Sequence, residues 1–277
     1  MTKTRDYEIA LTGLADWDDY LMRESGLPGP RGNLELADAF ANLADERLIV
    51  RLASLGPDAA PVNTPQEFLA FCGVLGYGRL VADGKLSRLG DLRQAASDPR
   101  WRLREACARA MQRVGDADLP TLLRTVAEWS GGNRLEQRAA LASICEPRLL
   151  RDRGAAELAL ALLDRVTASI RGADDTSTVE FRVLRQGLGY CWSVAVIALP
   201  EQGKPTLEKW LVDDDAQVRW VIRENLGKAR LARMDPVWVA AWKSKTQERT
   251  DAPDAGIPIS PERRAFANSS NVPAQYD

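Results

Sequence analysis

The chain has 277 residues, of which 45% are hydrophobic and 27% are charged, and these are ordinary values for a soluble globular protein. It contains no histidine, so catalysis by serine–histidine or cysteine–histidine arrangements is excluded. The formal net charge of −2 argues against a globally basic nucleic-acid-binding protein, although it leaves room for a local basic surface.

The first 50 residues are acidic, with five basic and ten acidic side chains, and they show no apolar signal region. We interpret the cluster Asp16, Asp18 and Asp19 as a solvated helix start rather than a metal site, because acidic groups suit that end of the helix dipole. The following stretch SGLPGPRGN, residues 25–33, lacks the ending of a phosphate loop. It predicts an ordered connection in which Asn33 caps the next helix, and a partner-contact role for it stays open.

Two helices are predicted next. Residues 34–55 form one amphipathic pattern that ends at Gly56-Pro57. The sequence Thr64-Pro65-Gln66-Glu67 is a helix start, with Thr as N-cap and Pro in the first turn. Glycines at 73, 76 and 78 interrupt the apolar stripe that follows. This helix is therefore expected either to end early or to pack closely against a neighbour.

From residue 86 onward, short turns separate one helical pattern after another, and no run of alternating β-branched residues suggests a strand. The turns contain Ser-Asp-Pro, Gly-Asp, Gly-Gly-Asn and Glu-Pro. The predicted helices span 86–96, 99–114, 116–129, 135–145, 155–170, 179–199, 205–211, 217–231 and 236–242.

Alternate helices of this series begin alike. Asp98 precedes Arg104 by six residues and Asp213 precedes Arg219 by six, while the helices around Arg138 and Arg182 carry looser copies. The four arginines are separated by 34, 44 and 37 residues, a spacing typical of a two-helix repeat. The pattern Asp-Pro-x-x-x-Leu-Arg, followed by an apolar helix and a Gly-Asp turn, resembles HEAT repeats.

This resemblance implies an all-α fold, a HEAT-like right-handed α-solenoid of stacked antiparallel helix pairs over residues 86–242. Residues 1–85 look helical without a clear copy of the repeat, so they are expected to form a divergent N-terminal helical cap. Residues 243–277 are polar and rich in Pro, Ser and Asn, which predicts a flexible, disordered tail.

The four cysteines lie in apolar helical patterns with no CxxC pair, so they are expected to be reduced core residues of a cytoplasmic protein. The longest apolar run, 194–200, is far shorter than the ~20 residues of a membrane span. We therefore expect no membrane segment, no metal and no cofactor.

The arginine-rich helix 99–114 admits two interpretations. In the first, arginines such as Arg104, Arg138 and Arg219 bond between helix layers and have a structural role. In the second, the arginines and tryptophans that project away from the apolar stripes line a concave binding surface. The residues assigned to that surface are Trp101, Arg102, Arg109, Arg113, Arg185, Trp220 and Arg223.

The function predicted from this pattern is a non-catalytic interaction scaffold that binds a protein partner on its concave face. The alternative is a DNA-binding or DNA-repair protein, because the chain is distantly similar to the HEAT-like DNA alkylation-repair glycosylases in having repeats with Trp and Arg. The adjacent pair Trp17-Asp18 does not match the catalytic context of that class, so no catalytic residue is transferred. A small-molecule enzyme is disfavoured by the absence of histidine.

Overall fold

The computed structural model describes residues 2–251, and the side chains of residues 2–246, and throughout this part of the chain every regular element is a helix. The all-α prediction is thus confirmed. The first helices are α1 (Lys3–Thr12), α2 (Asp18–Arg23), α3 (Leu34–Leu43), α4 (Glu46–Ala53) and α5 (Pro65–Ala82).

The segment expected to form one helix over 34–55 is in fact two helices, α3 and α4. The break falls at Ala44 and Asp45, and the Asp45 carboxylate accepts a hydrogen bond from the Leu48 amide at 2.7 Å. This cap satisfies a free amide at the start of α4, so a new helix begins where the apolar pattern alone continues.

The predicted start of α5 is confirmed, because Thr64 is its N-cap and the Thr64 hydroxyl accepts from the Glu67 amide. The helix does not end early at its glycines. A Cβ atom on Gly73 would lie 2.1 Å from the Ala53 amide nitrogen, and one on Gly78 would lie 2.5 Å from the Ala110 carbonyl oxygen. These glycines let the backbones of α4 and α7 approach α5 closely, so the close-packing interpretation is correct.

The rest of the described chain follows the predicted order, with shifted boundaries. A glycine and a lysine at 227–228 divide the predicted helix 217–231 into two, and the last helix continues beyond 242 to Asp251. The remainder of the predicted tail, 252–277, lies outside the described residues. The elements are η1 (Leu86–Arg88), α6 (Leu89–Ala96), α7 (Trp101–Ala117), α8 (Leu119–Trp129), α9 (Arg134–Ile144), η2 (Leu149–Arg151), α10 (Arg153–Ile170), α11 (Val179–Ala198), α12 (Pro200–Leu211), α13 (Ala216–Leu226), α14 (Ala229–Met234) and α15 (Pro236–Asp251).

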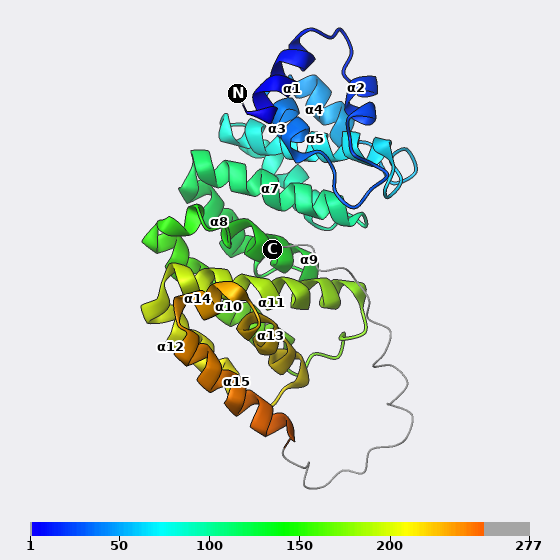
Figure 1. Ribbon diagram of the computed structural model, residues 1–277. Coiled ribbons are helices and arrows are strands. Elements are labelled where there is room, and N and C mark those ends of the chain that lie inside the picture. The colour runs from blue at the N-terminus through cyan, green and yellow to red at the C-terminus, as the bar shows by residue number, and fades with distance from the viewer. Residues whose placement is uncertain (1, 252–277) are drawn as a thin grey trace.

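The helices stack in chain order from one end of the molecule to the other (Figure 1). Helices α5, α7, α9, α11 and α13 pack successively against one another, and we call them the inner row. Each of α7, α9, α11 and α13 also packs against the helix that precedes it, namely α6, α8, α10 and α12. The seven residues predicted to contact a partner lie on helices α7, α11 and α13 of the inner row.

Two of the connections between successive helices consist of a single residue, which both ends the first helix and precedes the second. Asp118 ends α7 and at the same time caps α8, where its carboxylate accepts from the Thr121 amide at 3.1 Å. Leu199 ends α11 and directly precedes Pro200, the first residue of α12. These two short connections join one helix pair to the next, and in each case the connected helices pack against each other.

One hydrophobic core runs through the described chain from Leu11 to Val239 without a break near residue 85. Its large members include Trp129 and Trp192, and the Trp192 indole donates to the Thr167 hydroxyl at 3.0 Å. All four cysteines are buried and free, as the sequence predicts. Burial raises the pKa of the Cys107 thiol to about 12, so this group stays protonated.

Candidate functional site

The seven residues predicted to contact a partner fall into two groups in the structure. Those on α7 lie beside α3 and α5, and those on α11 and α13 lie two and three helices further along the inner row. The two groups differ in how their arginines are neutralised, and this difference decides which group is available for binding.

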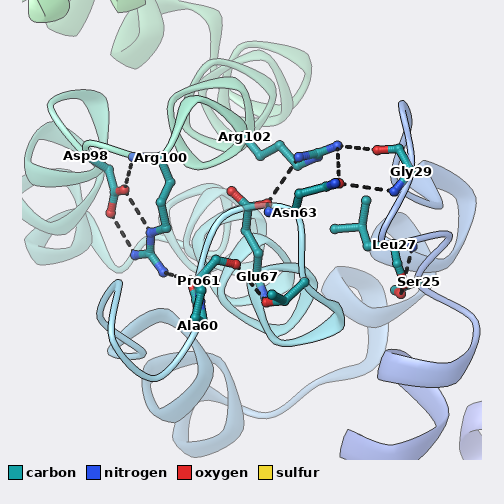
Figure 2. A network of polar contacts seen from close by, with 11 residues as sticks. Ser25, Leu27, Gly29, Ala60, Pro61, Asn63, Glu67, Asp98, Arg100 and Arg102 are labelled. Carbon is teal, nitrogen blue, oxygen red and sulfur yellow. Dashed lines mark hydrogen bonds and ion pairs between the residues drawn. The ribbon is translucent and has the colours of Figure 1, made fainter.

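Arg102 is buried, which corrects the expectation that it projects outward. Its guanidinium forms an ion pair with the fully buried Glu67 at 3.2 Å, donates to the Gly29 carbonyl at 2.6 Å and reaches the Asn63 side chain at 3.3 Å (Figure 2). The loop 25–33 and Asn63 cover the face of α7 that the helical wheel left open. Arg102 therefore holds two connections of the fold in place and is not a surface residue.

Arg100 is a second buried arginine, and it is not among the residues predicted from the sequence. It forms a two-point ion pair with Asp98 and donates to the Ala60 carbonyl (Figure 2). It also donates to the Leu55 carbonyl at 2.9 Å. The available signal was weak, because Asp-x-Arg is common at helix starts. Together Arg100 and Arg102 bind the beginning of α7 to the connections that flank α3, α4 and α5.

Arg109 and Arg113 both contact helix α3. Arg109 forms an ion pair with Asp38, and Arg113 lies 3.5 Å from the same carboxylate and donates to the Asn42 side chain at 2.5 Å. Burial lowers the pKa of Arg113, and the negative charge of Asp38 opposes this shift. Both arginines are only half-exposed and already neutralised by a carboxylate.

Trp101 is the α7 residue that does lie at the surface, with 42% of its area exposed. Its ring stacks on the Arg102 guanidinium at 4.4 Å, so its orientation is fixed from beneath by a buried group. The sequence left open whether Trp101 packs between layers or faces solvent, and the structure places it facing solvent.

Arg185 and Trp220 form a stacked pair across α11 and α13. The guanidinium of Arg185 lies 4.3 Å from the Trp220 ring centroid and donates to the Gln217 side chain at 2.5 Å. Gly189 allows this arrangement, because a Cβ atom there would lie 3.1 Å from the Trp220 ring. Burial lowers the pKa of Arg185 and repulsion from Arg182 adds to the shift, whereas the negative charge of Glu224 opposes it.

Three exposed arginines surround this pair, and none of them has a carboxylate within ion-pair distance among the described residues. Arg182 lies one helical turn from Arg185 on α11, and Arg219 and Arg223 lie one turn apart on α13 beside Trp220. We call Arg182, Arg185, Arg219, Trp220 and Arg223 the arginine face.

Two carboxylates lie close to the arginine face. Glu224 lies 3.9 Å from Lys228, the N-cap of α14, and adjoins Gly189, and Glu180 is exposed in the first turn of α11. The acidic run 213–215 lies at the start of α13, where Asp213 pairs with Arg171 and Asp215 caps the helix. The face is thus positive and bounded by acidic groups.

The arginines that mark the repeat have a structural role in two cases. Arg104 is buried and donates to the carbonyls of Asp98 and Pro99 in its own turn, at 2.7 and 3.0 Å. Arg138 crosses from α9 to α7, where it pairs with Glu105 and reaches the Arg104 carbonyl. The Arg104 guanidinium thus bonds backbone carbonyls, and Arg219 pairs with no acid in the described chain.

No other grouping in the described chain offers convergent chemistry. A surface hollow between α6, the start of α7 and α9 is lined by Arg93, Ser97 and Glu136, but Arg93 is already paired with Glu136 and Glu128. Within the described residues no three His, Cys, Asp or Glu side chains gather as metal ligands. None of the described helices is long and apolar enough to cross a membrane.

Comparison with known proteins adds no assignment, since no family model matches the chain and a search of curated proteins finds no match. We therefore infer the function from the arginine face and from the helical architecture that presents it.

Proposed function

We propose that the chain is a HEAT-like right-handed α-solenoid that acts as a non-catalytic scaffold and binds a protein partner on its inner row. The repeated arginines, the paired antiparallel helices and the successive contacts of α7, α9, α11 and α13 support the architecture. The four free cysteines are consistent with a cytoplasmic location.

The observation that carries the function is the arginine face. Elsewhere on the inner row the buried Arg104 bonds backbone carbonyls, and the other arginines that we compare are paired with carboxylates, namely Arg79, Arg102, Arg109, Arg113, Arg134 and Arg138. The four arginines around Trp220 are not, although arginine with tryptophan is the combination most enriched at energetically important positions of protein interfaces. We therefore propose the arginine face, together with the exposed Trp101, as the partner-contact surface.

DNA is the second candidate partner, and the stacked Arg185–Trp220 pair is the observation that favours it. Arginine binds phosphate, and an aromatic ring can stack on a base. Against DNA stand the net charge of −2 and the acidic run 213–215 beside the face. Both features weaken the long-range attraction that phosphate binding needs.

The test is affinity capture with the full-length chain as bait, with and without nuclease. Three forms are compared: the natural chain, the double variant Arg182→Glu/Arg223→Glu, and the control variant Arg47→Glu/Arg151→Glu. The control introduces the same charge change at exposed arginines that pair with no acid in the described chain and lie outside the face.

We expect a protein that survives nuclease treatment to be captured by the natural and control forms and lost by the Arg182→Glu/Arg223→Glu variant. Capture that disappears with nuclease would support the DNA alternative. Capture that is equal for all three forms would overturn the assignment of the binding surface.

A further inference from the structure

We infer that the arginine face binds an acidic segment of its protein partner, a short stretch of polypeptide whose Asp or Glu side chains reach Arg182, Arg185 and Arg223. This inference rests on the proposed function and names the chemistry of the partner. Three features of the face support it.

The first feature is uncompensated charge. Arg182 and Arg185 lie on adjacent turns of α11, and Arg219 and Arg223 lie on adjacent turns of α13. Like charges at this spacing on a helix repel one another and destabilise the helix. An incoming carboxylate removes this repulsion and gains charge-assisted hydrogen bonds, so the unbound face is poised to accept negative charge.

The second feature is preorganisation. The Arg185 guanidinium is held between the Trp220 ring and the Gln217 amide oxygen, and its Nε atom is buried without a hydrogen-bond acceptor in the described chain. A side chain that is already fixed loses little rotamer freedom when it binds. Arg185 therefore provides a rigid donor between the exposed Arg223 and the exposed Arg182, whose Nε donates to the Thr178 carbonyl at 3.2 Å.

The third feature is the limited extent of the positive surface. It spans only two helices and is bounded by Glu180, Glu224 and the acidic run 213–215. A nucleic acid presents phosphates at regular intervals along its whole length and would meet these carboxylates. A short acidic peptide with neutral flanks fits the available area without that repulsion.

The experiment is fluorescence anisotropy with the full-length chain and three labelled probes. The first is a short peptide rich in Glu with interspersed Leu, the second is the same peptide with every Glu replaced by Gln, and the third is a single-stranded DNA of the same charge as the first. We expect the Glu peptide to bind about tenfold or more tightly than either other probe, with an affinity that falls as salt is raised.

Two double variants test whether the Glu peptide binds at the arginine face. Arg182→Glu/Arg223→Glu should weaken binding of the Glu peptide by about tenfold or more, whereas Arg47→Glu/Arg151→Glu should leave it within about twofold. Circular dichroism and thermal unfolding of each variant establish that it is folded. Equal loss in both variants would show a nonspecific effect of net charge and overturn the inference.

Other outcomes separate the two proposals. Equal binding of the Glu and Gln peptides, or tighter binding of the DNA, overturns the acidic-segment inference. If the captured partner still depends on Arg182 and Arg223 while the Glu peptide does not bind, the scaffold proposal stands and this inference falls. If neither the captured partner nor the peptide depends on the face, both are wrong.

Discussion

The region around α7 and the region around α11 and α13 use arginine in opposite ways. Beside α7, Arg102 and Arg109 pair with Glu67 and Asp38 on neighbouring helices and hold the fold together. Between α11 and α13 the arginines have no carboxylate partner in the described chain. The comparison teaches that the number of arginines on a helix says little about binding, because a nearby acid converts the same residue into a structural contact.

In the region of α11 and α13, a neutral side chain rather than an arginine links the two helices. The fully buried Asn225 donates to the carbonyls of Leu188 and Val221 at 2.9 and 2.8 Å, and its oxygen accepts from the Ser193 amide at 2.8 Å. Because Asn225 ties α13 to α11 without charge, the arginines nearby are not needed for that contact. Substitutions in the two regions should therefore have very different effects on stability.

The largest effect is expected for Arg102→Met. It leaves the Glu67 carboxylate buried without a cation, and breaking a buried ion pair in this way costs about 3–5 kcal/mol of unfolding free energy. Denaturant unfolding measures the loss. Adding Glu67→Gln removes the stranded charge while keeping an acceptor for the Asn63 amide, so the double variant should recover part of the stability. If the double variant is no more stable than Arg102→Met, the stranded Glu67 charge is not the cause of the lost stability.

A smaller loss is expected for Asn225→Leu. The substitution leaves the buried Ser193 amide and the Leu188 carbonyl without partners, at a cost of about 1–3 kcal/mol. The measurement is again denaturant unfolding, with Gln186→Leu on the exposed side of α11 as the control. If both variants lose the same amount, α11 and α13 are held by apolar packing rather than by this amide.

Asp38→Asn should cost less, about 0.5–1 kcal/mol, because the pairs that it makes with Arg109 and Arg113 are partly exposed. The loss should shrink as salt concentration rises, since salt already screens the pairs in the natural chain. Thermal unfolding at low and high salt measures this, and Asp58→Asn, at an exposed and unpaired aspartate, is the control. A loss independent of salt would contradict an electrostatic origin.

The smallest effect on stability is expected for Arg182→Glu/Arg223→Glu. These side chains are exposed and pair with no carboxylate in the described chain, so the unfolding free energy should stay within about 0.5 kcal/mol of that of the natural chain. Together with loss of binding, this result would establish the face as functional rather than structural. A loss of about 2 kcal/mol would instead assign the arginines to the architecture.

Local signals allowed much of the fold to be predicted. Thr64 and Asn33 cap the helices that they were expected to cap, and the cysteines are buried as their apolar surroundings indicate. Asp45 was overlooked because a capping aspartate inside a continuous apolar pattern resembles an exposed helical residue.

Local sequence signals could not predict which carboxylates the arginines of α7 pair with. Arg102 meets Glu67 across 35 residues of sequence, and Arg109 meets Asp38 across 71. A helical wheel shows which residues leave the apolar stripe, but it does not show which loop or helix covers the opposite side. The outward placement of Arg223 followed from its own helix, whereas the burial of Arg102 depends on the distant loop 25–33.

The turn at Asp118 limits how the molecule can deform. Because this one residue both ends α7 and caps α8, a change in the angle between the two helices must come from rotation about its own backbone bonds. The connection between α10 and α11, residues 171–178, is longer, but its Asp175 pairs with Arg134 of α9 and its Gly172 amide donates to Asp215, the N-cap of α13. The entry to the helix that carries Arg182 and Arg185 is therefore tied to the helices on both sides, so contacts outside the arginine face help to fix the spacing of its binding groups.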